Sequence, residues 1–149
     1  MTTIAEALAA SHQRASEFTR SLFEESWTSD QVADFINRRR NATIATTNPQ
    51  GQPHAAVVIA GSVDQGIYFT VAPSSVLARN MTSNDRIAFS VCDSLHAVMG
   101  QGRGVRVGNA VELMLLIDKL AKASNANCFT PDGWDGDLFT IDIRRIFAN

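Results

Sequence analysis

The chain has 149 residues, of which 45% are hydrophobic and 19% are charged, and its formal net charge is -2. A chain of this length and composition fits one domain with an ordinary hydrophobic core. The charge balance leaves no excess of positive charge for a phosphate backbone, so we expect no nucleic-acid partner. No apolar run approaches the roughly 20 residues needed to cross a bilayer, so we also expect no membrane association.

The two cysteines, Cys92 and Cys128, lack the spacing of metal ligands or of a disulfide framework. The three histidines are scattered along the chain, and together with the cysteines they predict no metal site. The chain shows no cationic segment followed by an apolar leader. We therefore expect a cytoplasmic protein.

The first forty residues have helical patterns. Apolar and small residues recur at three- or four-residue steps over residues 4–22, which predicts one amphipathic helix. Thr28 and Gln31 then form a capping box ahead of a second apolar face. The run Arg38-Arg39-Arg40 ends this helix, where cations complement the helix dipole, an interpretation that we favour over an anion site. We expect residues 1–40 to pack as a helical segment on the domain that follows.

From residue 42 onward, β-branched and aromatic residues alternate between turn residues, as strands require. A short helix capped by Ser74 or Ser75 interrupts the strands, and another helix is expected to begin near Asn109 and Glu112. The strand over residues 53–60 has no polar alternation, so both of its faces should be covered. The expected strands are residues 42–47, 53–60, 67–71, 87–91, 98–107 and 139–146.

Short strands joined by hairpin turns favour a barrel over an open parallel sheet, because parallel pairs would need a helix between most strands. The expected fold class is therefore mainly β with helices. It consists of a six-stranded β-barrel over residues 41–149 with two N-terminal helices in front, all in one structural domain.

The fifth of these strands is glycine-rich. The period of two places Gly100, Gly102 and Gly104 on one face, so that face is bare backbone. Glycine weakens a strand, and three at alternate positions need a reason. We favour a bulge or a closely packed helix; the other explanation is a flat ligand lying against this face.

Three further features have two interpretations each. The helix start at Ser74 and Ser75 is either an ordinary cap or an anion site, since free N–H groups there suit a phosphate. His54 is more simply a structural histidine than a catalytic one. The loop over residues 130–136 is either a lid carrying Trp134 or a surface loop with Trp134 packed against the barrel.

Residues 35–111 resemble the flavin-binding split-barrel family that includes pyridoxamine 5'-phosphate oxidase. The resemblance lies in the order and spacing of several segments: residues 42–46, 50–54, 67–70, 75–81 and 85–88. Members of that family are homodimers with FMN in a groove between the subunits. The resemblance therefore implies a six-stranded split β-barrel, a homodimer and a flavin site.

The resemblance also implies roles for individual residues. Backbone groups of the strand at Val57 would contact the edge of the isoalloxazine ring, and Gln101 would lie near the ring system. Thr70 and Ser75 would lie near the phosphate, with Asn80 supporting that turn. The predicted cofactor-binding residues are Ala56, Val57, Val58, Thr70, Ser74, Ser75, Arg79, Asn80, Gln101 and Arg103.

The chain departs from the family at the phosphate site. Members that bind FMN tightly have basic residues after the serine, whereas this chain has Val76 and Leu77. Each missing charge-assisted contact is typically worth about 1.5–3 kcal/mol, so FMN affinity should fall unless Arg79 or Arg103 compensates.

The function indicated is an FMN- or deazaflavin-dependent oxidoreductase that transfers hydride or electrons to a small organic substrate. The alternative is a non-catalytic dimeric binding protein that uses the same groove for deazaflavin, haem or another tetrapyrrole, or another small ligand. Binding of no cofactor at all is the remaining possibility. No residue has the pattern of a general acid or base; His54 and Arg103 are the candidates for that role.

Overall fold

The computed structural model describes residues 1–23 and 27–149. Five helices and six strands lie in this part of the chain, and none of these helices is long and apolar enough to cross a membrane. In chain order the elements are α1 (Ile4–Arg14), α2 (Glu17–Leu22), α3 (Ser29–Arg39), β1 (Asn41–Thr47), β2 (Pro53–Val63), β3 (Gly66–Val71), α4 (Val76–Ser83), β4 (Arg86–Cys92), β5 (Ala97–Asn109), α5 (Met114–Ala123) and β6 (Asp137–Ala148).

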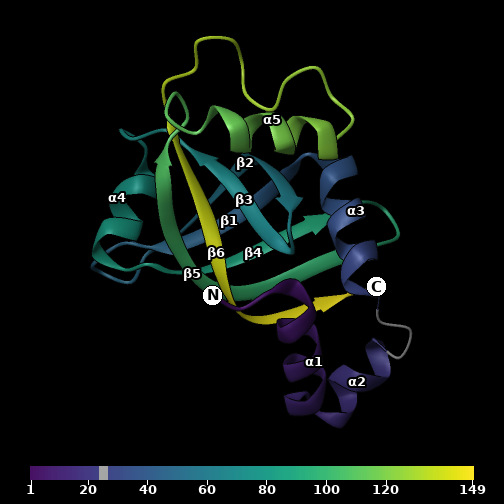
Figure 1. Ribbon diagram of the computed structural model, residues 1–149. Helices are drawn as coiled ribbons and strands as arrows, with labels where there is room; N and C mark the ends of the chain where they lie inside the picture. Colours follow the sequence, from purple (N-terminus) through teal and green to yellow (C-terminus); the bar gives the residue numbers. More distant parts are fainter. Residues whose placement is uncertain (24–26) are drawn as a thin grey trace.

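The six strands form a closed antiparallel barrel in the order β1-β2-β3-β6-β5-β4. The predicted fold class, mainly β with helices around a six-stranded barrel, is confirmed. Strand alternation produces the interior: in β3, for example, Ile67, Phe69 and Val71 are buried. Figure 1 shows α3 at one end of the barrel, α4 at the other, and α5 lying across β2 and β3.

The main hydrophobic core is shared by the barrel and the helices around it. Ile4 of α1, Phe35 of α3 and Leu77 of α4 belong to the same buried cluster as the inward side chains of the strands. A second, smaller cluster lies under α5 and includes Leu120 and Phe129. The N-terminal helices thus contribute side chains to the barrel core.

The predicted single helix over residues 4–22 is wrong. Helix α1 ends at Arg14, Ala15 is extended, and the side chain of Ser16 caps a separate helix by accepting a hydrogen bond from the backbone N–H of Thr19. The apolar period continues through Phe18, but this side chain is 72% exposed. A new helix starts at Ser16 although the apolar pattern continues, because the Ser16 side chain bonds to a backbone N–H group of the first turn that would otherwise be unpaired.

Helix α3 begins as predicted with the capping box of Thr28 and Gln31. It ends at Arg40, whose φ of 61° places it in the left-handed conformation that commonly terminates helices. The helix at residue 109 begins later than expected. Asn109 is the last residue of β5, its side chain accepts a hydrogen bond from Val111, and α5 starts only at Met114.

The three alternate glycines of β5 face the barrel interior. An added Cβ at Gly102 would collide with the backbone oxygen of Asp142, and one at Gly104 would lie 2.6 Å from the Met81 sulfur. The register of β5 on β6 shifts between Gln101 and Gly102, which marks an irregularity of the bulge type. The favoured explanation, a bulge with close packing, is therefore confirmed.

We predict that Gly102→Ala lowers the free energy of unfolding by about 2 kcal/mol or more, because the new methyl group meets backbone that cannot move aside. Gly104→Ala is the matched control and should cost clearly less, since the flexible Met81 side chain can shift. Urea denaturation of both variants measures the difference. Equal stability losses would contradict this view of the strand.

Candidate functional site

The barrel is split between β2 and β3. Strand β2 pairs with β1 from Pro53 to Ile59, but it pairs with β3 only from Ala60 to Val63. Over residues 53–59, none of the described strands pairs with the other side of β2. We call this side of residues 53–59 the free edge.

The direction of the backbone groups along the free edge follows from two hydrogen bonds. The N–H of Ala60 donates to the backbone oxygen of Arg40, the residue just before β1, whereas the oxygen of Ile59, on the opposite side, accepts from the Thr70 hydroxyl at 3.4 Å. Because these directions alternate along a strand, Val57 points its N–H and C=O to the free edge, and Ala56 and Val58 point theirs to β1.

Of the three predicted backbone contacts, the structure therefore brings only Val57 to the free edge. The same alternation also brings Ala55 there, a residue that the sequence analysis missed. No local signal in the sequence shows whether the odd or the even residues point their backbone groups to the free edge. That depends on which side of β2 is paired with β1. The side chain of Val57 is 72% exposed, so the strand is accessible at this point.

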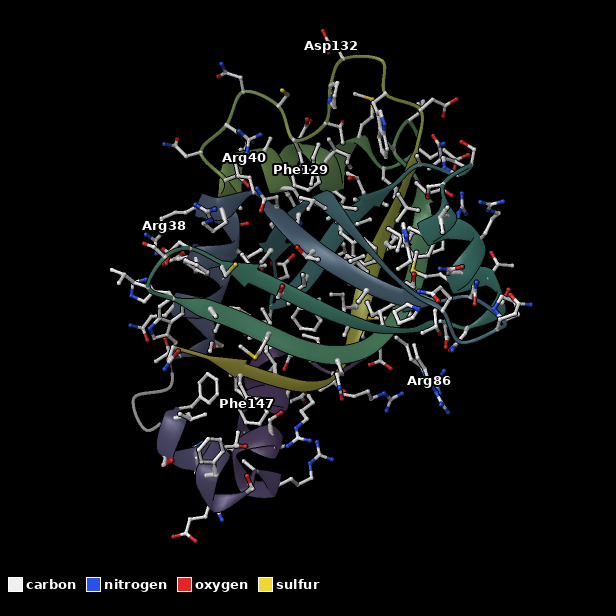
Figure 2. The ribbon with its side chains drawn as sticks, turned by 180° about the vertical axis from the view of Figure 1, so that it is seen from behind. Arg38, Arg40, Arg86, Phe129, Asp132 and Phe147 are labelled. Carbon is white, nitrogen blue, oxygen red and sulfur yellow. The ribbon has the colours of Figure 1, made fainter. Side chains whose placement is uncertain are left out.

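An open surface continues from the free edge across the barrel wall. We call it the outer face; it comprises the outward side chains of β1, β2, β4 and β5. They are mostly small: Thr43, Ala45, Ala55, Val57, Ala88, Ser90, Met99 and Gln101. The register places them in rows, with Ala45 between Ala55 and Ala88 and with Thr43 between Val57 and Ser90. Figure 2 looks onto this face, and none of the described helices crosses it.

The outer face is hollowed around Gln101. This side chain lines a cavity of about 440 Å³ together with Ala45 and Ala88, and a second of about 300 Å³ with Met99 and Phe147. The structure thus places Gln101 on an open, mainly apolar surface. The expectation that both faces of residues 53–60 are covered holds only in part, because the cluster under α5 covers the outward side at Ile59, whereas Val57 is exposed.

The predicted phosphate residues lie where β3 leads into α4. Ser75 caps α4 by accepting a hydrogen bond from the N–H of Ala78 at 3.1 Å, and Ser74 beside it is exposed. Thr70 is buried, and its hydroxyl donates to the Ile59 oxygen. The start of α4 therefore offers hydroxyl and backbone donors a few residues after Thr70, which contacts the end of the free edge at Ile59.

Residues 76 and 77, where other members of the family have cations, differ from each other in exposure. Val76 is 39% exposed at the first turn of α4, whereas Leu77 is 2% exposed and packs in the main core. Arg79 is exposed one turn after Ser75, on the same side of the helix. Asn80 is buried, and its side-chain amide donates to the Thr46 hydroxyl at 3.0 Å, which fixes α4 to β1.

Arg103 and His54 both lie away from this turn, each in its own surroundings. The guanidinium of Arg103 forms an ion pair with Asp85 and lines another cavity, beside the β1–β2 turn. Because Asp85 pairs with Arg103, this arginine is less able to replace the cations that are missing from the phosphate site. His54 is partly buried and pairs across the sheet with Thr46, which also receives the Asn80 hydrogen bond.

The loop before β6 is fastened to the end of β5. The side chain of Asn109 donates to Asp135 at 2.8 Å, and the N–H of Ala110 donates to the Gly136 oxygen. Trp134 lies against Gly136 and lines a cavity of about 300 Å³ next to α5. Arg106 and Asp137 form a two-point ion pair nearby, and that carboxylate raises the pKa of Arg106.

In the described part of the chain, no group of three or more potential ligands is arranged to hold a metal ion.

We predict that Leu77→Lys strongly destabilises the protein, by about 3 kcal/mol or more, because it removes a buried side chain and introduces a charge into the core. Val76→Lys is the matched control on the neighbouring residue and should change the unfolding free energy by less than about 0.5 kcal/mol. Thermal and urea denaturation test both. A stable Leu77→Lys protein would contradict the orientation of α4 described above.

Comparisons with known proteins agree with this architecture. The family model for pyridoxamine 5'-phosphate oxidase matches residues 28–147. No protein of curated function matches the sequence. Among solved structures, Atu2129 from Agrobacterium tumefaciens, of unknown function, has a TM-score of 0.62 and 23% identity. That match covers 80% of this chain but only 55% of the Agrobacterium protein.

Two further structures carry functional names. An F420 reductase has a TM-score of 0.57 and 18% identity, with 75% of this chain and 92% of that chain covered. The haem storage protein HutZ from Vibrio cholerae has a TM-score of 0.61 and 15% identity, with 79% and 92% covered. Identities this low show the shared fold alone. The match of the family model over most of the chain shows more: this protein belongs to the pyridoxamine 5'-phosphate oxidase family.

Proposed function

We propose that the protein binds a flavin, FMN, along the free edge of β2 in a groove between two copies of the chain, and acts as an oxidoreductase. The observation that carries this proposal is the exposed backbone of Val57 beside the open outer face. The pyrimidine edge of a flavin alternates a hydrogen-bond donor with acceptors. An unpaired strand edge, which alternates N–H and C=O groups, is complementary to it.

In this proposal the second copy of the chain packs against the outer face. Its small side chains form a flat, mainly apolar surface, which suits a stable contact with another flat surface. The cavities around Gln101 would persist between two such faces, because Ala45 and Ala88 do not fill them. A ring bound at the free edge would then have one wall from each copy.

The phosphate end of the groove would rest on the start of α4. Ser74, Ser75 and the first N–H groups of the helix are the donors, and Arg79 is the nearest cation along α4. A bound flavin would supply the hydride or electron transfer, while this chain's residues bind it, orient it and exclude water. Substrate would stack on the exposed face of the bound ring, near Gln101.

A second candidate is a binding function without catalysis, for deazaflavin or haem in the same groove. The observation that favours it is the loss of cations at the phosphate site: Val76 is apolar, Leu77 is in the core, and Arg103 is paired with Asp85. The names of the F420 reductase and HutZ make these two ligands the ones to compare with FMN. His54, tied to the barrel end near Thr46, remains our candidate for a catalytic group in the oxidoreductase.

We predict that Val57→Pro lowers FMN affinity about tenfold or more, because it removes the N–H group at the free edge without breaking the ladder with β1. Val57→Ala is the matched control: it keeps the N–H and should bind within about threefold of wild type. Fluorescence titration with FMN gives both affinities, and circular dichroism checks the fold.

The same titration with reduced deazaflavin and with haemin separates the two candidate functions. Saturable FMN binding that is lost in Val57→Pro supports the flavin proposal. Binding of haemin or deazaflavin alone supports the second candidate. A wild-type protein that binds none of the three, or one that runs as a monomer in gel filtration, overturns the groove between copies.

A further inference from the structure

A separate cavity of about 430 Å³ lies at the end of the barrel away from α4. One side of α3 forms its floor, the hairpin between β4 and β5 forms one wall, and the residues that end α5 form the other. Figure 2 shows Arg38 at this end of the molecule and Arg86 toward the opposite end. The residues that line this cavity include none of residues 53–59, so it does not overlap the free edge, and its size is in the range of small-molecule sites.

The wall of this cavity is aromatic and held in place. The rings of Trp27 and His96 lie 5.2 Å apart, and Phe35 supports both from the core, at 5.1 and 6.1 Å. Asp93 orients His96: it accepts the N–H groups of Leu95 and His96 at 2.8 and 2.7 Å, and its second oxygen lies 3.4 Å from the His96 ring nitrogen. These backbone hydrogen bonds hold the pKa of Asp93 below its usual value.

The floor of the cavity carries two opposite charges that do not pair. Asp34 and Arg38 are four residues apart on α3 and both line the cavity. This spacing normally favours an ion pair, yet no ion pair joins these side chains in the residues that the structure describes. The Arg38 guanidinium instead lies over the Phe35 ring, 5.7 Å from its centre.

Hydrogen-bonding groups complete the lining. The Ser124 hydroxyl oxygen is buried and has no hydrogen-bond partner within the described chain. Gln31 and Asn125 add side-chain amides, whereas the amide of Asn37 is already bonded to the backbone of Ser62. An unsatisfied buried hydroxyl costs stability unless a water or a ligand bonds to it.

We propose that this cavity binds a small aromatic zwitterion, of the class of the aromatic α-amino acids. The ring would stack on Trp27 and His96, the carboxylate would face Arg38, and the ammonium group would face Asp34. Ser124 and Asn125 would bond to the polar end of the ligand. This site is independent of the flavin groove, and no residue serves both.

The test uses Trp27 as the reporter. The chain has two tryptophans, so Trp134→Phe leaves Trp27 as the only one. Titration of this protein with L-phenylalanine should give a saturable fluorescence change. Phenylacetate, which lacks the ammonium group, and phenethylamine, which lacks the carboxylate, should each bind about tenfold more weakly.

Variants of two exposed residues on α3, made in the Trp134→Phe protein, test which charged group of the ligand each residue contacts. Arg38→Gln should weaken L-phenylalanine about tenfold and leave phenethylamine unchanged, whereas Asp34→Asn should weaken L-phenylalanine and leave phenylacetate unchanged. Val57→Pro should not alter any of the three affinities, which separates this site from the flavin groove. No saturable change up to about 10 mM L-phenylalanine, or equal binding of all three ligands to every variant, overturns the proposal.

Discussion

The short pairing between β2 and β3 is the constraint on which the rest of the structure depends. These strands share a ladder only over residues 60–63, so seven residues of β2 keep one backbone edge unpaired within the barrel. An exposed edge is normally a liability that proteins cover or blunt. Here β3 ends at Val71 and the chain continues into α4, whose Leu77 and Met81 pack in the main core. The edge is thus linked to the packing of the core.

Closing the barrel despite this split requires the other strands to bend. Strand β5 spans Ala97–Asn109 and pairs with both β4 and β6, which is possible because its inward glycines let neighbouring backbone approach closely. Its outward side chains then continue the flat surface of β1 and β4. The free edge, the outer face and the hollow around Gln101 are therefore consequences of one geometry. This geometry is the basis on which we propose a flat ligand and a second copy of the chain.

Much of the fold could be predicted from the sequence, because strand alternation and the capping box at Thr28 are local signals. The break between α1 and α2 was missed because the apolar period continues through Phe18, and only the Ser16 cap reveals the new start. The glycines of β5 could be assigned to one face but not to the inside or the outside. That choice depends on contacts with Met81 and β6, far away in the chain.

The candidate site was less predictable for the same reason. The family resemblance indicated the strand at Val57 and the turn at Ser75; Val57 lies on the free edge, and Ser75 caps α4 after β3 ends. Which backbone groups face the free edge depends on β1 lying on the other side, and the burial of Leu77 depends on the docking of α4. The pairing of Arg103 with Asp85 joins residues 18 positions apart. Such non-local contacts leave no pattern in the sequence around a single residue.

We propose that a flavin completes the unpaired backbone edge at Val57. Amide hydrogen exchange of β2, measured with and without saturating FMN, tests it most directly. Val57 should exchange rapidly in the free protein and slow markedly with FMN, while Ala56 and Val58, already bonded to β1, should change little. An exchange rate at Val57 that FMN does not alter would contradict the account.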